Sequence, residues 1–290
     1  MEKRKKFKLL SLSIPALALI VMFLFIPLGN ALRISLYKWN GYSQSMKFIG
    51  FENYLDIFTD KVFWRSTANT FIYAFGSTIL QNIIGLATAV LVNQKFKGRN
   101  FVRLILYMPI MISGVIMGAM MSYIFDYNNG VLNNILNLFG MENVYWMGSG
   151  PLAVMIITLV NSWQAMGYCM LIYLAGLQNI PTMYREAARL DGANKRQEFF
   201  HIVVPLLIPS ITIAVVTNLI GGFKIYDVIV TLTGGGPNRK TLSLSYYLSL
   251  LYFNDEKAGY AAAVGVALIL IIFVVTIPIN RFLRSREVEY

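Results

Sequence analysis

Long uncharged apolar runs dominate the chain and recur from its start to its end. A bilayer core about 30 Å thick needs roughly 20 apolar residues for each helical span, and six runs of about that length are present. They predict transmembrane helices at about 9–32, 66–94, 104–125, 151–177, 202–232 and 258–280. Only the fifth run contains charged side chains, those of Lys224 and Asp227. The pattern predicts an all-α membrane protein with six spans in a single transmembrane domain, residues 1–290.

Two connections between these runs have patterns of their own. Segment 33–65 contains KFIGFENYLDIF, whose aromatic residues suit the interface between membrane and water. Segment 126–150 is rich in Asn and Gly and has room for one short helix at 131–139. Neither connection is long enough to form a separate domain.

The composition agrees with a membrane protein and narrows its chemistry. The 290 residues are 57% hydrophobic and 13% charged, with a mean hydropathy of +0.58, whereas soluble domains have about a quarter charged residues. The first run is too long for a signal-peptide core and no A-x-A-like site precedes Arg33, so we expect it to be retained as a helix. The single cysteine, Cys169, excludes an intramolecular disulfide, and we expect it to be a small buried apolar residue.

The distribution of Lys and Arg predicts the orientation, because cytoplasmic loops carry an excess of both. With the N-terminus inside, the cytoplasmic segments contain most of the 25 Lys and Arg residues. These are Lys3, Arg4, Lys5, Lys6, Lys8, Lys95, Lys97, Arg99, Arg103, Arg185, Arg189, Lys195, Arg196, Arg281, Arg284 and Arg286. We therefore expect both termini in the cytoplasm. The net charge of +11 follows from this bias and from contact with anionic lipids, so it implies no nucleic acid partner.

One charged stretch, YREAARLDGANKRQEFFHIVVPLLIP at 184–209, interrupts the apolar sequence on the cytoplasmic side. Pro181 suits the first turn of a helix, and Gly192 is placed to end it. Asn194 and Gln197 have the spacing of a capping box for a second helix. The stretch predicts a surface helix, a tight turn and the cytoplasmic start of the fifth span.

This loop, at about 178–201, has two interpretations on physical grounds. Small residues at Ala187, Ala188, Gly192 and Ala193 would let another protein surface approach the backbone closely, and the surrounding charges would orient it. The same pattern is also typical of an amphipathic helix that lies on lipid headgroups.

The segment EAARLDGANKRQEFFHIVVPLLIP resembles the EAA motif in the membrane subunits of bacterial ATP-binding-cassette importers. The matching positions are Glu186, Ala187, Ala188, Asp191, Gly192, Ala193, Phe199, Ile202, Pro205 and Pro209. The resemblance implies a type I importer permease fold, with this helix seated in a cleft of an ATPase subunit. Glu186 would make polar contacts in that cleft, the small residues would permit close approach, and Pro205 and Pro209 would shape the helix that enters the membrane.

A second segment, FKIYDVIVTLTGGGPNRKT at 223–241, resembles the end of the fifth helix in carbohydrate importers, such as the first permease subunit of maltose and glycerol-phosphate systems. The resemblance implies a multi-pass protein of the bacterial inner membrane that forms half of a pathway for a sugar, with a di- or oligosaccharide favoured. It also implies three partners: a second homologous permease, an ATPase dimer that holds ATP and Mg²⁺, and an extracellular or periplasmic sugar-binding protein.

No phosphate-binding loop is evident in this sequence. GGGPNRKT at 234–241 has Gly, Lys and Thr at P-loop spacing, but Arg239 replaces the second glycine and Pro237 lacks a backbone donor. The only histidine, His201, has no cluster of Cys or carboxylate residues that would complete a metal site. We therefore expect no catalytic activity, metal or cofactor on this chain, and ATP hydrolysis on another polypeptide.

Polar side chains in the fourth and fifth spans are candidates for contact with the solute. They are Asn161, Trp163, Gln164, Asn218, Lys224 and Asp227. Lys224 and Asp227 are three residues apart, so on one helix they would be neighbours and could pair. Amides, carboxylates and aromatic faces suit a neutral sugar, but the same groups also join packed helices. Both roles stay open.

An ion-coupled secondary carrier that acts alone is the alternative function, with Lys224 and Asp227 as its coupling groups. Such a carrier would keep its activity when Glu186 or Gly192 is changed. An importer driven by a separate ATPase would lose activity in those variants.

Overall fold

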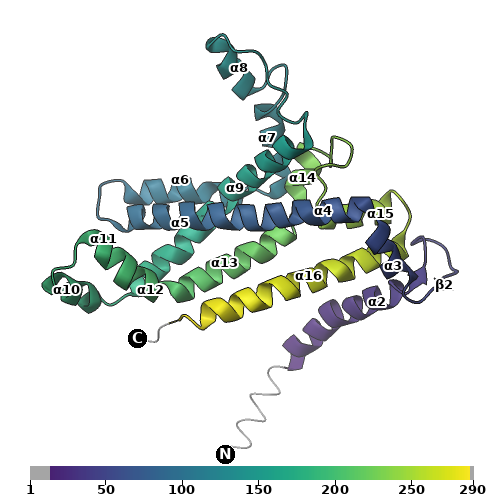
Figure 1. Cartoon of the computed structure of the whole chain (residues 1–290), viewed down its shortest axis with the longest axis horizontal. Coiled ribbons are helices and arrows are strands. Elements are labelled where there is room, and N and C mark those ends of the chain that lie inside the picture. Colours follow the sequence, from purple (N-terminus) through teal and green to yellow (C-terminus); the bar gives the residue numbers. More distant parts are fainter. Residues whose placement is uncertain (1–13, 288–290) are drawn as a thin grey trace, which may run out of the picture. The chain divides into compact units, whose positions relative to one another are not determined.

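The computed structural model describes residues 14–287, and its regular structure is almost entirely helical (Figure 1). Among these residues, four continuous helices are long and apolar enough to cross a membrane, and two pairs of helices, each bent at a short break, raise the number to six if each pair is one span. The predicted all-α membrane fold is therefore confirmed. The chain divides into two compact units, residues 1–60 with 248–269 and residues 61–247 with 270–290. The assignment of one domain stays a prediction.

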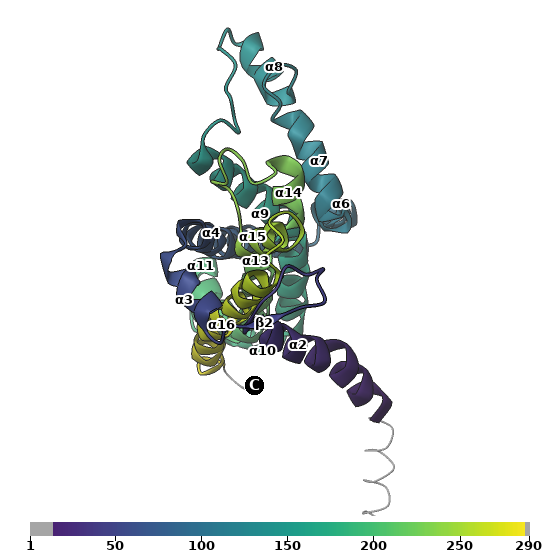
Figure 2. The same cartoon turned by 90° about the vertical axis from the view of Figure 1, so that its right-hand side faces the viewer.

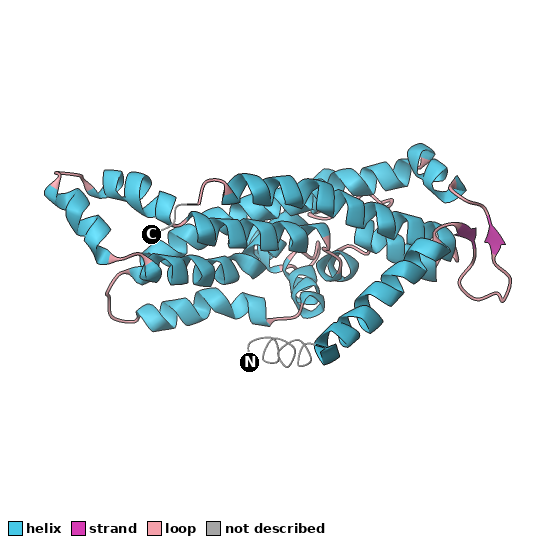
Figure 3. Ribbon diagram, turned by 90° about the horizontal axis from the view of Figure 1, so that it is seen from below, coloured by secondary structure: helices cyan, strands magenta, loops and turns pink. Residues whose placement is uncertain are grey.

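The first unit contains the first span and the loop that follows it. The helix Ile14–Ile34 includes a π-helical turn, η1 (Val21–Phe25), and α2 (Ile26–Ile34), and none of its apolar window is buried. The loop forms an antiparallel hairpin, β1 (Tyr37–Lys38) and β2 (Lys47–Phe48), and then α3 (Glu52–Thr59) (Figure 3).

A buried asparagine closes this loop. Asn53 is 5% exposed and donates from Nδ2 to the carbonyl oxygens of Ser35 and Tyr37, at 2.7 and 3.0 Å. The loop also meets the last span in the same unit, where the Gly259 N–H donates to the Trp39 carbonyl at 3.0 Å. The aromatic stretch that sequence analysis assigned to the interface is thus a folded cap on its own unit.

The second unit contains the second to fifth spans. Its helices are α4 (Lys61–Phe71), η2 (Ile72–Gly76), α5 (Ser77–Asn93), α6 (Arg99–Met111), α7 (Gly114–Ile124), α8 (Val131–Leu138), α9 (Gly150–Asn179), α10 (Thr182–Leu190), α11 (Lys195–Glu198), η3 (Phe199–Val203), α12 (Val204–Leu206), α13 (Ile208–Phe223) and α14 (Asp227–Leu232). Two further helices, α15 (Leu244–Phe253) and α16 (Ala258–Arg284), contribute to both units. The short helix expected at 131–139 is present as α8.

Glycines bring the spans of this unit into close contact. A Cβ atom on Gly85 of α5 would overlap Cys169 of α9, and one on Gly167 of α9 would overlap the backbone of α6. Small residues at such crossings let membrane helices pack without bulky side chains between them. As Figure 1 shows, α5 and α6 run side by side. Cys169 is fully buried in this packing, as expected.

The third predicted span, 104–125, is not one straight helix. α6 and α7 meet at a bend of 100°, and Figure 2 shows α7 leading away to α8. Pro109 lies inside the last turn of α6, where it lacks a backbone donor, and Ile112 has an extended backbone (φ −81°, ψ 130°). Ser113 then caps α7 by accepting a hydrogen bond from the Ile116 N–H. Hydropathy does not register this break because every residue across it is uncharged.

The fifth predicted span, 202–232, is also wrong in its extent. The chain bends by 65° between α12 and α13, next to Pro209, and α13 ends at Phe223. Lys224 is the C-cap residue of α13, whereas Asp227 is the first residue of the separate helix α14. The two charged residues therefore do not share a helix face.

Candidate functional site

The EAA segment (residues 184–209) folds as two helices joined by a glycine turn. Gly192 has φ +83°, which glycine adopts without strain. The N–H groups of Gly192 and Ala193 donate to carbonyls in the last turn of α10, at 3.1 and 2.9 Å, in the Schellman pattern. Asn194 and Gln197 then form the expected capping box, with both hydrogen bonds at 2.9 Å. The predicted surface helix, turn and second helix are confirmed.

A buried carboxylate fixes α10 against α11. The Glu198 side chain is 7% exposed and accepts a hydrogen bond from Arg189 Nε at 2.9 Å. Arg185 Nε lies 3.0 Å from Glu198 Oε1, an ion pair without hydrogen-bond alignment. The hydrogen bond with Glu198 raises the pKa of the Arg189 guanidinium, so this group stays charged. Sequence analysis gave Glu198 no role, although its position four residues after Asn194 places it on the inner side of α11.

The outer face of the EAA segment is exposed and mixes apolar and charged residues. Met183 and Leu190 are 65% and 89% exposed, and Glu186 and Ala187 lie between them on α10. Of the other predicted coupling residues, Asp191 and Gly192 are exposed, Ala193 and Pro205 are half-buried, and Ala188 is buried. Ala188 is therefore on the inner face of α10, where its small size lets α10 pack on its own chain. Glu186, Ala187, Asp191 and Gly192 are the coupling residues that are exposed.

Three of the predicted pathway residues make hydrogen bonds within the unit. Asn161 Nδ2 donates to Ser77 Oγ at 3.0 Å. Asn218 Nδ2 donates to Cys169 Sγ. Gln164 Nε2 donates to the Ile112 carbonyl at 2.8 Å, which is the carbonyl at the break between α6 and α7. These bonds fit the helix-joining role that sequence analysis kept open, and Trp163, 39% exposed, is the one of this group that faces outward from α9.

Lys224 and Asp227 do not form the predicted pair. Within residues 14–287 no ion pair joins them, and both side chains are exposed. Asp227 instead packs on Gly114, the first residue of α7: a Cβ atom added to Gly114 would lie 3.1 Å from Asp227 Oδ2. A carboxylate at the start of α14 and beside the start of α7 is stabilised by the partial positive charge of both helix ends.

Lys224 belongs to a different feature, an open stripe on α13. Thr217, Gly221 and Lys224 follow at helical spacing and are all exposed. The stripe holds a hydroxyl, a bare backbone position and a cation, so it offers hydrogen-bonding groups on a helix that otherwise packs against α5 and α9.

Buried polar side chains of α4 and η2 hold the loop after α14, which sequence analysis did not anticipate. Asn69 Nδ2 donates to the carbonyls of Lys240 and Leu242 at 2.8 and 3.0 Å. The Tyr73 hydroxyl donates to the Thr241 carbonyl at 2.8 Å. Partners separated by about 170 positions leave no signal in local spacing, so only the structure reveals this contact.

Comparison with known proteins agrees with this architecture. Residues 81–287 match the family model described as binding-protein-dependent transport system inner membrane component. The chain is 32% identical to the probable ABC transporter permease protein YurN of Bacillus subtilis, over 95% of this chain and 96% of that protein. It is also 32% identical to the trehalose/maltose transport system permease protein MalF of Thermococcus litoralis, over 94% of this chain and 93% of the relative.

A solved structure shares the fold. It is a chain from the crystal structure of a bacterial alginate ABC transporter in complex with alginate pentasaccharide-bound periplasmic protein, with a TM-score of 0.84 and 22% identity. The match covers 98% of this chain and 96% of that chain. The family match, the six-span helical fold and the EAA segment lead to one conclusion: this chain belongs to the family of inner membrane components of binding-protein-dependent transport systems.

Proposed function

We propose that this chain is one of two permease subunits of an ATP-driven carbohydrate importer, and that the EAA segment docks on a separate ATPase. The observation that carries the proposal is the structure of α10. Ion pairs with Glu198 hold its inner side, and its outer side exposes Met183, Glu186 and Leu190. A rigid helix with an exposed apolar and charged face is suited to a protein cleft, because protein interfaces combine apolar contact with oriented charge.

The same construction provides a route for motion into the membrane. Glu198 ties α10 to α11, and α11 continues through η3 and α12 into the bend that precedes α13. A displacement of α10 by the ATPase would therefore move the helix that carries the open stripe of Thr217, Gly221 and Lys224. In this proposal ATP binding brings the EAA segments of two permeases together and opens the pathway outward, and hydrolysis reverses the movement.

The proposal includes the partners that such a system needs. These are a second homologous permease, an ATPase dimer that binds ATP and Mg²⁺, and an extracellular or periplasmic binding protein that delivers the solute. The named trehalose/maltose relative supports a carbohydrate, and a di- or oligosaccharide is the size class we assign. Both termini and the EAA segment lie in the cytoplasm in this arrangement, as the distribution of Lys and Arg predicts.

The rival function, an ion-coupled carrier acting alone, loses its main support. It used Lys224 and Asp227 as coupling groups, but α13 ends between them and no ion pair joins them within residues 14–287. The exposed EAA face would also have no role in such a carrier.

The first test is purification of the tagged chain from its native membrane in mild detergent, with mass spectrometry of the proteins that accompany it. We expect an ATPase and a second permease in fixed ratio. In the Gly192→Asp variant we expect an inserted chain that recovers less ATPase and imports at least about tenfold less sugar, because the added charge obstructs the docking face.

Gly192→Asn is the matched control, because asparagine tolerates a positive φ and adds no charge. It should retain more ATPase than Gly192→Asp. Recovery of the chain alone, with uptake driven by an ion gradient and unchanged in Gly192→Asp, would overturn the proposal.

A further inference from the structure

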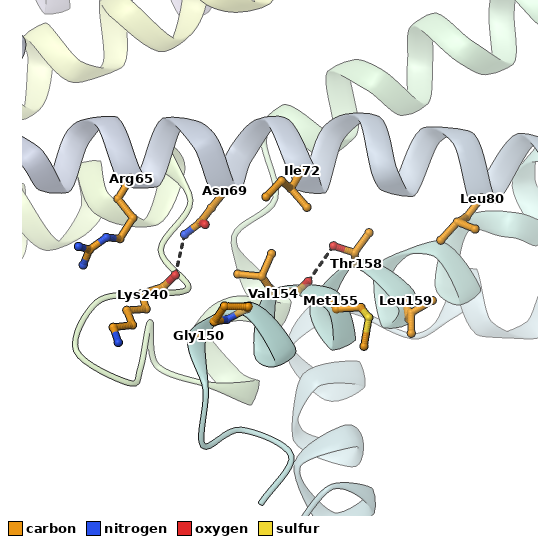
Figure 4. Close-up of a pocket in the computed structure, with 11 residues that line it drawn as sticks. Arg65, Asn69, Ile72, Leu80, Gly150, Val154, Met155, Thr158, Leu159 and Lys240 are labelled. Atoms are coloured by element: carbon orange, nitrogen blue, oxygen red, sulfur yellow. Dashed lines mark hydrogen bonds between the residues drawn. The ribbon is translucent and has the colours of Figure 1, made fainter.

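An apolar groove lies within the second unit, between the helix Lys61–Asn93 and the start of α9 (Figure 4). It encloses about 550 Å³. On one side the lining residues Arg65, Asn69 and Ile72 follow at helical spacing. On the other side Met155 and Leu159 lie one turn apart on α9. None of the pathway or EAA residues lines this groove.

The α9 wall of the groove is about as long as one leaflet of a bilayer. It runs from Gly150 to Leu159, ten residues that span about 14 Å at 1.5 Å per residue. Half of a hydrocarbon core about 30 Å thick is about 15 Å. Most of the side chains that line the groove between its ends are apolar, including Ile72, Leu80 and Met155, with Thr158 as a polar exception. The groove thus has the depth and the surface of a site for one acyl chain.

Two cationic side chains lie at one end of the groove. Figure 4 shows the side chains of Arg65 and Lys240 at the same end of the groove, away from Leu80. Both are exposed, and neither has an ion-pair partner within residues 14–287. This end also contains the start of α9, and the distribution of Lys and Arg places that end on the outer side of the membrane.

Contacts with Asn69 and Gly150 fix the position of Lys240. Its carbonyl accepts a hydrogen bond from Asn69 Nδ2 at 2.8 Å. Its side chain crosses the first residue of α9, since a Cβ atom on Gly150 would lie 2.7 Å from Lys240 Cβ. A glycine at this position therefore allows the lysine to lie over the helix end beside Arg65.

We infer that the groove is a binding site for an anionic phospholipid of the outer leaflet. One acyl chain lies between the helix Lys61–Asn93 and α9, and the phosphate lies between Arg65 and Lys240. Apolar packing alone gives little preference among lipids, because the surrounding bilayer is equally apolar. The two cations supply the selectivity, at roughly fivefold for each positive charge close to an anionic headgroup.

The test is native mass spectrometry of the purified membrane complex, or of the chain alone, after exchange into nanodiscs that contain phosphatidylglycerol and phosphatidylcholine with identical acyl chains. We expect phosphatidylglycerol to be retained in preference to phosphatidylcholine by roughly 25-fold. Each of Arg65→Gln and Lys240→Gln should lower the preference roughly fivefold. The control Lys61→Gln, on the same helix but outside the groove, should leave it unchanged.

A second variant separates the acyl chain from the headgroup. Met155→Trp fills the apolar wall at a side chain that is 53% exposed, so it should reduce retention of both lipids without unfolding α9. Equal retention of the two lipids, or retention unaffected by Arg65→Gln, Lys240→Gln and Met155→Trp, would overturn the inference. Efficient crosslinking of Met155→Cys to a second membrane subunit would also overturn it, because a protein helix would then occupy the groove.

Discussion

Individual side chains determine how rigidly α10 is held with its exposed face outward. Glu198 is the one buried carboxylate among the described residues of the EAA segment, and it faces both Arg185 and Arg189. Arg185 Nε is itself shielded from solvent. Removing the carboxylate would take the hydrogen-bond acceptor from Arg189 and the ion-pair partner from Arg185. Glu186, next to Arg185 in the sequence, is exposed and makes neither of these contacts.

Glu198→Ala should loosen α10 without preventing insertion of the chain. We expect local opening of α10 to become about 5- to 150-fold more frequent, which corresponds to about 1–3 kcal/mol for the loss of hydrogen bonds to a charged group. Hydrogen exchange of the α10 amide groups measures this directly. Glu186→Ala is the control, and its exchange rates should match those of the parent protein; equal protection in both variants would show that Glu198 does not hold α10.

At the scale of elements, two breaks within apolar segments shape the bundle. The junction of α6 and α7 leaves backbone groups without helical partners, and Gln164 on α9 reaches one of them, the Ile112 carbonyl. In hydrocarbon, an unpaired carbonyl costs free energy that water would otherwise offset. Gln164 in the fourth span therefore satisfies the carbonyl at the break in the third span, which explains why a polar side chain occurs at this position.

Gln164→Leu should destabilise the protein by about 1–3 kcal/mol, because the Ile112 carbonyl loses its donor. The measurement is thermal unfolding in detergent alongside uptake kinetics. A lower melting temperature with unchanged apparent affinity for the sugar supports the helix-joining role. An unchanged melting temperature with weaker affinity would instead make Gln164 a solute contact. Trp163→Phe, one residue away and exposed, should leave the melting temperature unchanged.

Some of these elements were predictable from the sequence and others were not. The turn at Gly192 and the capping box of Asn194 and Gln197 depend on local spacing, so the sequence predicts them correctly. Glu198 and Asn69 act through contacts that hydropathy does not encode. The bend after Met111 lies in an uncharged run, where only proline and the tertiary packing mark a break, and the end of α13 at Phe223 is marked by no proline.

For the whole molecule, the orientation in the membrane remains the property that links these parts to function. In the proposed orientation the EAA face meets an ATPase inside, and segment 126–150 lies outside. Cys169 is the only cysteine and is fully buried, so an introduced cysteine can be labelled with little background.

Asn128→Cys should react with a membrane-impermeant maleimide in intact spheroplasts, because this exposed residue lies in the outer loop. Ser285→Cys, exposed after α16, should react only after the membrane is opened. The readout is the mass shift of the labelled chain. Labelling of Ser285→Cys in sealed spheroplasts would place the C-terminus outside and reverse the proposed orientation of the EAA segment.

The open stripe on α13 also bears on how cells regulate the amount of this protein. A chain produced in excess of its partners would leave Lys224 uncovered on a helix that enters the bilayer, and an unshielded cation there is unfavourable. We therefore expect a subunit without its partners to be less stable in the bilayer than an assembled one. Balanced synthesis of the subunits, rather than expression of this chain alone, is therefore the condition under which it should accumulate.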